Sequence, residues 1–346
     1  MRRALPALLT VALMAAACTA GTPLEPAPTT EAPATTTTAG GETPTTEGSD
    51  TTTTSAPSET TTTEAAGDGF PVTIAAGNGD VTIEARPERI VSLSPTSTEI
   101  LFDLGAGDQV VAADSFSDFP ADAPTDPDLV ALSPNVEAIV EEHDPDLVVM
   151  TFDPGEVVAS FEALGVPVVV HLAPVTLDDT YTQYEQLGAA TANAATAAAA
   201  VARIQADLDT VVAEVGDAAA GLTYYHELDP TFFSATSTTF IGQVYGLFGM
   251  ENIADPADAD GAAFGFPQLS AEFILDADPD LVFLADTKCC DQTAGTVAER
   301  PGWSDLSAVP DGVVELDDDV ASRWGPRIVD FAQVIAEAVL ALEPVA

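Results

Sequence analysis

Apolar residues between Ala194 and Val215 recur at the spacing of an α-helix. The larger ones step by three or four positions: Val201, Ile204, Leu208, Val211 and Val215. Arg203, Gln205, Asp207, Asp209 and Glu214 lie off their shared face, and most of the remaining positions are alanine, so one face carries the large apolar side chains. A helix over these residues would be roughly 33 Å long, about the width of a small domain. The pattern predicts a rod that joins two halves of the chain.

Similar segments lie on the two sides of this rod. PNVEAIVEEHDPDLVVM (134–150) precedes it and PQLSAEFILDADPDLVFL (267–284) follows it. Each combines a short helix that carries a glutamate with Asp-Pro-Asp-Leu-Val and an apolar strand. Upstream in each half, a helix ends in glycine (ILFDLG and VYGLFG) and a short strand follows. Two recurrences in the same order predict two similar lobes.

The remaining pattern alternates strands with helices. Residues 70–84 read as a hairpin around Asn78-Gly79, and residues 89–93 as a buried strand. Thr96 and Glu99 have the spacing of a capping box at the start of the next helix. We expect an α/β fold, with two Rossmann-like lobes whose sheets are mostly parallel and a ligand cleft between them. The loops after Leu93, Ala113, Tyr225 and Leu316 would border that cleft.

The N-terminus has the form of a bacterial lipoprotein signal. Arg2 and Arg3 precede an apolar stretch and the sequence Ala15-Ala16-Ala17-Cys18. The pattern predicts that Cys18 is lipidated and anchors the mature protein to the outer face of the cell membrane; a plain secretory signal is the alternative. No later apolar run reaches membrane-spanning length.

Composition divides the rest of the chain. Residues 19–69 are rich in threonine, proline and glutamate, which predicts a disordered tether after the signal peptide of residues 1–18. We expect an N-terminal lobe over 70–175, a connecting helical segment over 176–218 and a C-terminal lobe over 219–346.

Acidic residues outnumber basic ones by 56 to 9, for a net charge of −47. Such a surface repels nucleic acid and anionic lipid headgroups, so neither is expected as a partner. The lipid anchor would be the contact with the membrane. Solubility or adaptation to salt accounts for the acidity without a specific acidic function.

The sequence carries no motif of a common enzyme class. It has no Gly-x-Ser-x-Gly, phosphate loop, dinucleotide fingerprint or paired-histidine zinc motif. His143, His171 and His226 are scattered and lack the spacing of a local metal site. We therefore expect a protein that is not an enzyme and has no resident metal or cofactor.

Cys289 and Cys290 are adjacent and follow an apolar strand. Two thiols outside the cell tend to oxidise. Neighbouring α-carbons are about 3.8 Å apart, below the usual disulfide range, so a bridge between them would be strained. We expect such a vicinal disulfide, which would give the cleft a stiff apolar loop.

Several motifs together resemble the periplasmic binding proteins for cobalamin and ferric siderophores. They are residues 86–95, 98–102, 115–120, 301–303 and 322–327 together with the two DPDLV strands, and the likeness covers residues 70–346. The resemblance implies a substrate-binding lipoprotein of an ABC importer. It would work as a monomer with a membrane permease and its ATPase, and the rigid helix between its lobes would limit hinge closure.

The resemblance also implies site residues. It places aromatic ligand contacts at Phe116, Phe233 and Phe266, and further cleft residues at Asp319, Arg323 and Trp324. Glu137 and Glu272 match the pair, one in each lobe, that docks onto arginines of the transporter. The segment between Glu137 and Pro145 is one residue longer than that between Glu272 and Pro279, which leaves the position of Glu137 open.

The small number of basic side chains in this chain favours some of the ligands that this family binds over others. Anionic ferric catecholates need several basic groups, and few arginines of this chain can reach one cleft together. A near-neutral metal chelate, a cobalt corrinoid or a ferric hydroxamate, is favoured. Two alternatives stay open: a haem receptor that uses Tyr225 or His226, and a surface sensor or adhesion module without a transport role.

Overall fold

The computed structural model describes residues 69–342. The predicted signal peptide with Cys18, and the predicted tether up to residue 68, lie outside the described residues. Between residues 69 and 342, no helix combines the length and apolar character that crossing a membrane requires. The strands of the described part form two four-stranded parallel sheets and a two-stranded hairpin, and the helices that alternate with them confirm the predicted α/β class.

The N-terminal lobe contains a sheet with the strand order β4-β3-β5-β6. Its strands are β3 (Ile90–Leu93), β4 (Val110–Ala113), β5 (Leu147–Met150) and β6 (Val168–Val170). Nearly every strand residue is buried because helices cover both faces, as is usual for parallel sheets. The helices of this lobe are α1 (Pro95–Asp103), α2 (Val136–His143), α3 (Val157–Ala163) and α4 (Leu177–Ala190), with a 3₁₀ turn η1 (Gly107–Gln109).

The hairpin of β1 (Val72–Ala76) and β2 (Gly79–Ile83) covers the β6 edge of this sheet. The Asn78 side chain donates to the carbonyl of Val168 at 2.9 Å and accepts from the N–H of Val170 at 3.1 Å. The N–H of Gly77 donates to the carbonyl of Val170 at 2.7 Å. The Asn78 amide thus takes the place of a neighbouring strand for β6.

The C-terminal lobe contains a second sheet with the order β10-β9-β7-β8. Its strands are β7 (Thr223–Glu227), β8 (Glu251–Asn252), β9 (Leu281–Leu284) and β10 (Val313–Glu315). Its helices are α6 (Phe240–Gly246), α7 (Ala271–Ala277), α8 (Thr287–Cys290), α9 (Ala294–Ala298), α10 (Asp318–Ser322) and α11 (Ile328–Ala341). Three 3₁₀ turns, η2 (Gly216–Ala219), η3 (Asp255–Asp258) and η4 (Trp303–Asp305), complete the chain.

The repeated Asp-Pro-Asp-Leu-Val has the same structural role in both lobes. The second aspartate of the motif accepts hydrogen bonds from the backbone where the neighbouring strand begins. In the N-terminal lobe, the Asp146 carboxylate accepts from the N–H groups of Glu88 and Arg89, ahead of β3. In the C-terminal lobe, Asp280 accepts from the N–H of Thr223, the first residue of β7. The sequence recurrence therefore reflects one way of joining two adjacent parallel strands.

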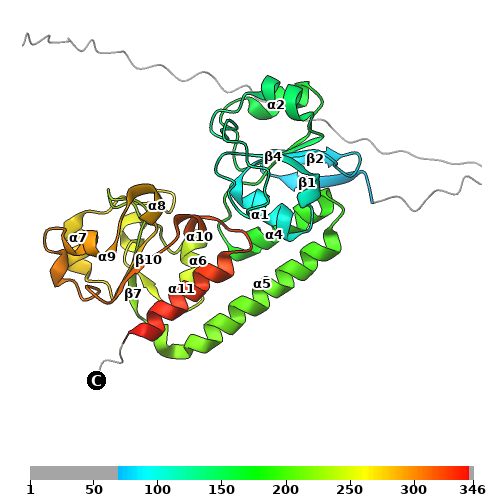
Figure 1. The fold of residues 1–346 in the computed structure, drawn as a ribbon. Helices are drawn as coiled ribbons and strands as arrows, with labels where there is room; N and C mark the ends of the chain where they lie inside the picture. Colours follow the sequence, from blue (N-terminus) through cyan, green and yellow to red (C-terminus); the bar gives the residue numbers. More distant parts are fainter. Residues whose placement is uncertain (1–68, 343–346) are drawn as a thin grey trace, which may run out of the picture. The chain divides into compact units, whose positions relative to one another are not determined.

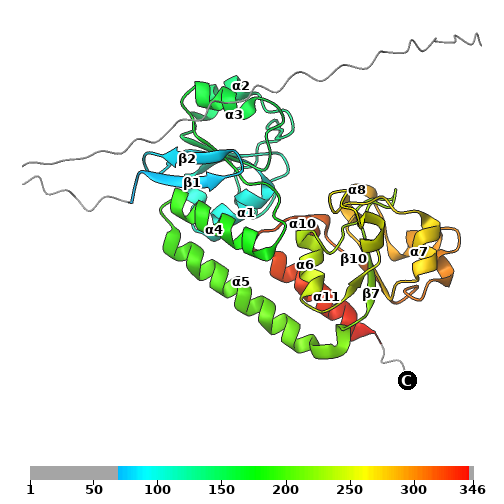
Figure 2. The same cartoon turned by 180° about the vertical axis from the view of Figure 1, so that it is seen from behind.

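The predicted rod is helix α5, which runs from Ala194 to Val215 as expected. Figures 1 and 2 show it alongside α4 of the N-terminal lobe and α11 of the C-terminal lobe. Its apolar face is buried and joins both helices in one hydrophobic cluster. Besides this shared cluster each lobe has its own core, one around β5 and one around β9. The rod is thus packed along its length against both lobes.

The capping box expected at Thr96 and Glu99 is wrong. The N-cap of α1 is Ser94, whose side chain accepts from the N–H of Ser97, and Pro95 occupies the first helical position. Proline suits that position because its missing N–H would have no partner there. Glu99 is therefore free of a capping role, and its side chain turns to two arginines described below.

Candidate functional site

Phe116 projects from a short turn after β4. The Asp114 carboxylate accepts from the N–H of Phe116 at 2.8 Å, and the N–H of Ser117 donates to the Asp114 carbonyl at 2.9 Å. Burial raises the pKa of Asp114, and the hydrogen bonds from Phe116 and Ser117 oppose that shift. The Phe116 side chain is 62% exposed, so this turn holds an aromatic ring out toward solvent.

Phe233 and Phe266 lie on adjoining segments of the C-terminal lobe. Phe233 forms an isolated antiparallel bridge with Gln268, and the N–H of Ser234 donates to the carbonyl of Pro267 at 3.0 Å. The two rings are 38% and 41% exposed. The preceding Phe232 turns the other way and stacks on Trp303. The structure thus brings two of the three predicted aromatic contacts together in one lobe.

Arg323 is buried and makes four hydrogen bonds, three of them to the other lobe. It donates to Glu99 at 3.0 Å, to Asp118 at 2.9 Å and to the backbone carbonyl of Phe116 at 2.9 Å. Within its own lobe it pairs with Asp319 at 2.6 Å. Arg323 and Asp319 therefore lie beside Phe116, but the guanidinium is already occupied by protein groups.

Trp324 is buried beside the same contact. Its indole Nε1 donates to the side-chain oxygen of Gln183 in α4 at 2.7 Å. The ring meets Phe240 edge to face, with centroids 5.6 Å apart. In this structure Trp324 thus packs between the lobes, whereas a ligand contact there, as expected from the resemblance, needs an exposed ring.

Glu99 is the residue of this region that the sequence analysis missed. It is fully buried on α1 and takes Arg327 in a two-point contact, from Nε at 3.0 Å and from Nη2 at 2.6 Å. Arg323 is its third donor. The guanidinium of Arg327 also lies over the ring of Phe119, at 4.5 Å from the centroid. Two arginines of one lobe therefore converge on one carboxylate of the other.

Carboxylates neutralise most basic side chains of the described chain. Five of the seven arginine and lysine residues between 69 and 342 form ion pairs with acidic residues: Arg203, Lys288, Arg300, Arg323 and Arg327. The other two, Arg86 and Arg89, precede β3 and lie at the amino ends of the strands. The loops at the carboxyl ends thus offer no unpaired arginine or lysine among the described residues.

Glu137 and Glu272 occupy equivalent positions. Each is the second residue of its helix, and each helix has a side-chain N-cap, Asn135 for α2 and Ser270 for α7. Both glutamates are exposed. Helix α2 is one residue longer than α7, and both end at an aspartate in the left-handed conformation. The extra residue therefore follows Glu137 and leaves its place at the helix start unchanged.

Cys289 and Cys290 form the end of the short helix α8 and are bonded to each other through their sulfur atoms. The Asp318 carboxylate accepts from the N–H groups of Lys288 and Cys289 at 3.0 and 2.8 Å. Lys288 in turn pairs with Asp319, the partner of Arg323. The cysteine pair is thus linked through α10 to the contact between the lobes.

The histidines have different surroundings. His226 is fully buried; its Nδ1 lies 2.9 Å from the Tyr245 hydroxyl, and burial lowers its pKa to about 3. Tyr225 is equally buried. His143 ends α2 beside Asp126 and Glu142, close enough for the three to share one ion. Sequence spacing missed this group because Asp126 comes from a separate loop.

Comparison with known proteins gives the family. A model of the periplasmic binding protein family matches residues 90–320. A cobalamin-binding protein of Halobacterium salinarum is 32% identical over 285 residues, which cover 78% of this chain and 74% of the relative. An uncharacterized ABC transporter substrate-binding lipoprotein of Bacillus subtilis, YvrC, is 28% identical over 282 residues, 78% of this chain and 86% of the relative.

A solved structure shares the fold. The vitamin B12 binding protein BtuF of Vibrio cholerae superposes with a TM-score of 0.59 at 24% identity, over 74% of this chain and 98% of that protein. The two parallel sheets joined by α5 are thus an architecture known from experiment. With the match over residues 90–320, these comparisons show that the chain belongs to the periplasmic binding proteins, the solute-binding subunits of ABC importers, and is a binding protein rather than an enzyme.

Proposed function

We propose that this protein is the extracytoplasmic receptor of an ABC importer for a bulky, weakly charged metal chelate. A cobalt corrinoid such as cobalamin is the first candidate, and a ferric hydroxamate siderophore is the second. The name of the Halobacterium salinarum relative supports the corrinoid. The chelate would sit between the lobes, against Phe116 on one side and Phe233 and Phe266 on the other.

The proposed ligand class rests on one observation: exposed aromatic rings lie near basic side chains that are already paired with carboxylates of the protein. Aromatic faces give a large contact area with little loss of side-chain entropy. An anionic ferric catecholate would need free cations, because each desolvated negative charge must be paired. Arg323, Arg327 and Lys288 are each held by carboxylates. A near-neutral chelate therefore suits these loops better.

Titration calorimetry tests the ligand class directly. We expect cyanocobalamin or a neutral ferric hydroxamate to bind, and a ferric catecholate to bind at least about a hundred-fold more weakly, a free-energy difference of about 3 kcal/mol. Preference for the catecholate would contradict the proposal. After gentle isolation, the visible spectrum of any co-purified ligand would separate corrin, ferric hydroxamate and haem.

Variants test the proposed contacts. Phe116→Ala, Phe233→Ala and Phe266→Ala should each weaken binding about tenfold or more, because buried aromatic contacts carry much of the affinity. Leu340→Ala, which removes an exposed apolar side chain of α11, serves as the control and should leave affinity unchanged. Unchanged affinity in all three phenylalanine variants would reject this placement of the ligand.

Delivery and anchoring complete the proposal. Glu137 and Glu272 would dock onto arginines of the permease, since paired surface carboxylates orient a basic partner. Cys18 would carry the lipid that holds the receptor, working as a monomer, at the outer face of the cell membrane. Mass spectrometry of the mature protein checks the anchor, and an unmodified Cys18 would rule it out.

A haem receptor and a surface sensor or adhesion module remain the alternatives. In this structure the side chains of Tyr225 and His226 are buried and thus offer no exposed ligand for haem iron. A Soret band in the purified protein would nevertheless establish haem as the cargo. If corrinoids, iron chelates and haem all failed to shift the melting temperature, a sensor or adhesion role would replace transport.

A further inference from the structure

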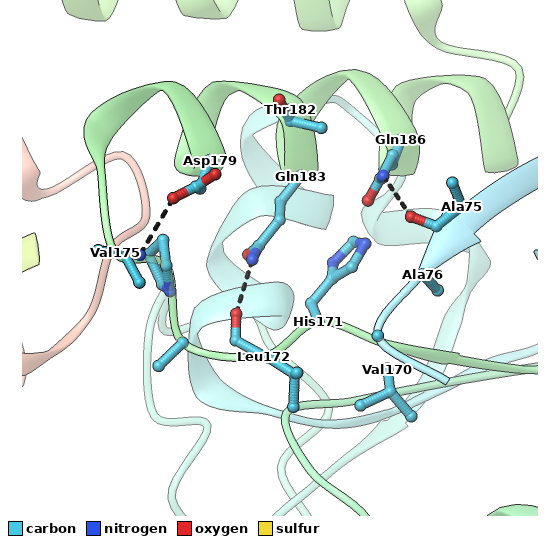
Figure 3. Close-up of a pocket in the computed structure, with 13 residues that line it drawn as sticks. Ala75, Ala76, Val170, His171, Leu172, Val175, Asp179, Thr182, Gln183 and Gln186 are labelled. Carbon is cyan, nitrogen blue, oxygen red and sulfur yellow. Dashed lines mark hydrogen bonds between the residues drawn. The ribbon is translucent and has the colours of Figure 1, made fainter. Parts of the chain in front are cut away.

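A hollow of about 380 Å³ lies between the N-terminal hairpin and α4, on the N-terminal lobe. Its walls are the end of β1, the segment that follows β6, and one face of α4 (Figure 3). None of the residues proposed above to contact the cargo lines it. It is therefore a separate feature of the molecule.

Hydrogen bonds tie the walls of the hollow together. The Gln186 amide donates to the carbonyl of Ala75 at 2.8 Å and ties α4 to the hairpin. The Gln183 amide donates to the carbonyl of Leu172 at 2.7 Å and ties α4 to the segment after β6. Figure 3 shows the two links on either side of His171. The walls of the hollow are thus tied to one another, and a ligand that reached the ring nitrogens of His171 would have to move the covering Gln183 or Gln186 side chain.

His171 lines this hollow, and its polar atoms are unused. Its side chain lies between Gln183 and Gln186 and the residue is only 3% exposed (Figure 3). Neither ring nitrogen has a hydrogen-bond partner among residues 69–342. Burial lowers the pKa of His171 to about 4; the Gln186 side chain lies beside the ring without meeting hydrogen-bond geometry and opposes that shift only in part. The neutral ring offers one N–H donor and one acceptor, and buried polar groups rarely stay unpaired.

The other lining residues define the chemistry of a suitable molecule. Within this lining, all of it in the described chain, no lysine or arginine is present to pair with an anion. The carboxylate at the rim, Asp179, accepts from the N–H groups of Val175 and Thr176. Leu172 and Val175 add exposed apolar surface. The lining suits an uncharged molecule with a donor, an acceptor and a small apolar part.

We propose that this hollow is a second ligand site, which takes a small uncharged amide-like or azole-like molecule paired with His171. Gln183 connects the site to the other lobe, because its side-chain oxygen accepts from the indole N–H of Trp324 at 2.7 Å. A ligand that contacts Gln183 would therefore change the surroundings of the Trp324 indole, beside the contact between the lobes.

Acetamide and acetate provide a matched pair of probes, since they have nearly the same shape and differ in charge. The chain has three histidines and two tryptophans, so its imidazole and indole NMR signals can be assigned with few variants. Acetamide titrated into the full chain should shift the His171 ring signals and the Trp324 indole signal in a saturable way. Acetate should shift neither signal.

Two matched variants test the location. Thr182→Trp puts a bulky side chain into the mouth of the hollow and should weaken acetamide binding by about tenfold or more. Thr210→Trp on α5 is the control and should bind acetamide like the wild type. Both threonines are exposed and donate to the carbonyl four residues earlier in their helix, so the two changes are locally alike.

Three results would overturn this second site. The first is that acetamide leaves the His171 and Trp324 signals unmoved, which would mean that the hollow holds water only. The second is that acetate binds as well as acetamide. The third is that the Thr182→Trp variant binds acetamide as tightly as the wild type. Since no corrinoid or iron chelate is used, these results are independent of the proposed cargo.

Discussion

The Nη2 atom of Arg323 donates to the backbone carbonyl of Phe116 at 2.9 Å, across the boundary between the two lobes. The same guanidinium holds Asp118, two residues further along that turn. A residue of the C-terminal lobe thus positions the loop that presents an aromatic ring of the N-terminal lobe. On this geometry Arg323 acts on a ligand through Phe116 more readily than by touching it.

The buried carboxylate of Glu99 should matter for stability far more than a surface ion pair does. Glu99→Ala leaves Arg323 and Arg327 without their shared partner, and breaking a buried pair costs about 3–5 kcal/mol. Arg203→Ala, which removes a pair with Asp103 in which the arginine is half exposed, should cost less than about 1 kcal/mol. Urea unfolding measures both changes, and equal losses would contradict the assignment.

Helices α4 and α5 should not tolerate a side chain at Gly188. A β-carbon there would lie 2.4 Å from that of Ala197, so Gly188→Ala should lower the unfolding free energy by about 1–3 kcal/mol. Adding Ala197→Gly should restore part of that loss. Gly246→Ala, which has open space around the new methyl group, is the control and should not destabilise the protein. Thermal unfolding of the three variants tests the close approach.

Asp286 should make stability fall as the pH rises. It is fully buried, and neither carboxylate oxygen has a hydrogen-bond partner within residues 69–342. Burial first, and then the charge of Glu227, raise its pKa from 3.8 to about 7. The folded protein therefore binds the proton more tightly than the unfolded chain. The resulting stabilisation is complete below about pH 4 and is lost as the pH rises through about 7.

Asp286→Asn removes this titration. The variant should be more stable than the wild type at pH 8, with a difference that shrinks toward pH 5, as measured by urea unfolding across that range. Asp276→Asn, an exposed change on α7, should follow the wild-type curve. A constant difference between wild type and Asp286→Asn at every pH would contradict the prediction.

Charge reversal should separate transport from binding. Glu137→Lys with Glu272→Lys should abolish uptake in cells while leaving ligand affinity unchanged, because both residues are exposed and neither is one of the proposed ligand contacts. Glu141→Lys, also exposed on α2, should retain uptake. Uptake assays with the same cargo used in calorimetry make the comparison. Normal uptake by the double variant would argue against docking through these glutamates.

The cysteine pair should be closed in the native protein. In a Cys18→Ala chain, a thiol reagent should find no reactive group before reduction and two afterwards, because the chain has three cysteines in all. Cys289→Ser should expose one thiol without any reductant. Two thiols titrating before reduction would show that the pair is open.

Local patterns predicted the parts of the fold that depend on neighbouring residues. The spacing of apolar residues correctly predicted the first and last residues of α5, because apolar residues on one face of a straight helix recur at a regular interval. The DPDLV repeat gave two equivalent lobes, because the same strand junction needs the same aspartate. The capping box failed because Ser94 followed by Pro95 is an equally good helix start, and spacing alone cannot rank the two.

Contacts between distant residues could not be predicted in this way. Arg323 meets Glu99 across 224 positions of sequence, and nothing local to either residue indicates the other. The resemblance marked Arg323 and Trp324 as cleft residues, but their burial depends on how the lobes pack. His171 follows β6 directly in the sequence, yet its burial without a hydrogen-bond partner arises only once the hairpin and α4 pack around it.

Both outer strands of the N-terminal sheet are shielded from pairing with other molecules. Asn78 occupies the free edge of β6, and on β4 the N–H and carbonyl of Ala113 are taken by the segment at Pro124 and Asp126. Unpaired edges invite strand addition and aggregation. Copies of this protein crowded together at high local density would therefore not pair through the edges of this sheet, and at β6 one hairpin amide provides much of that protection.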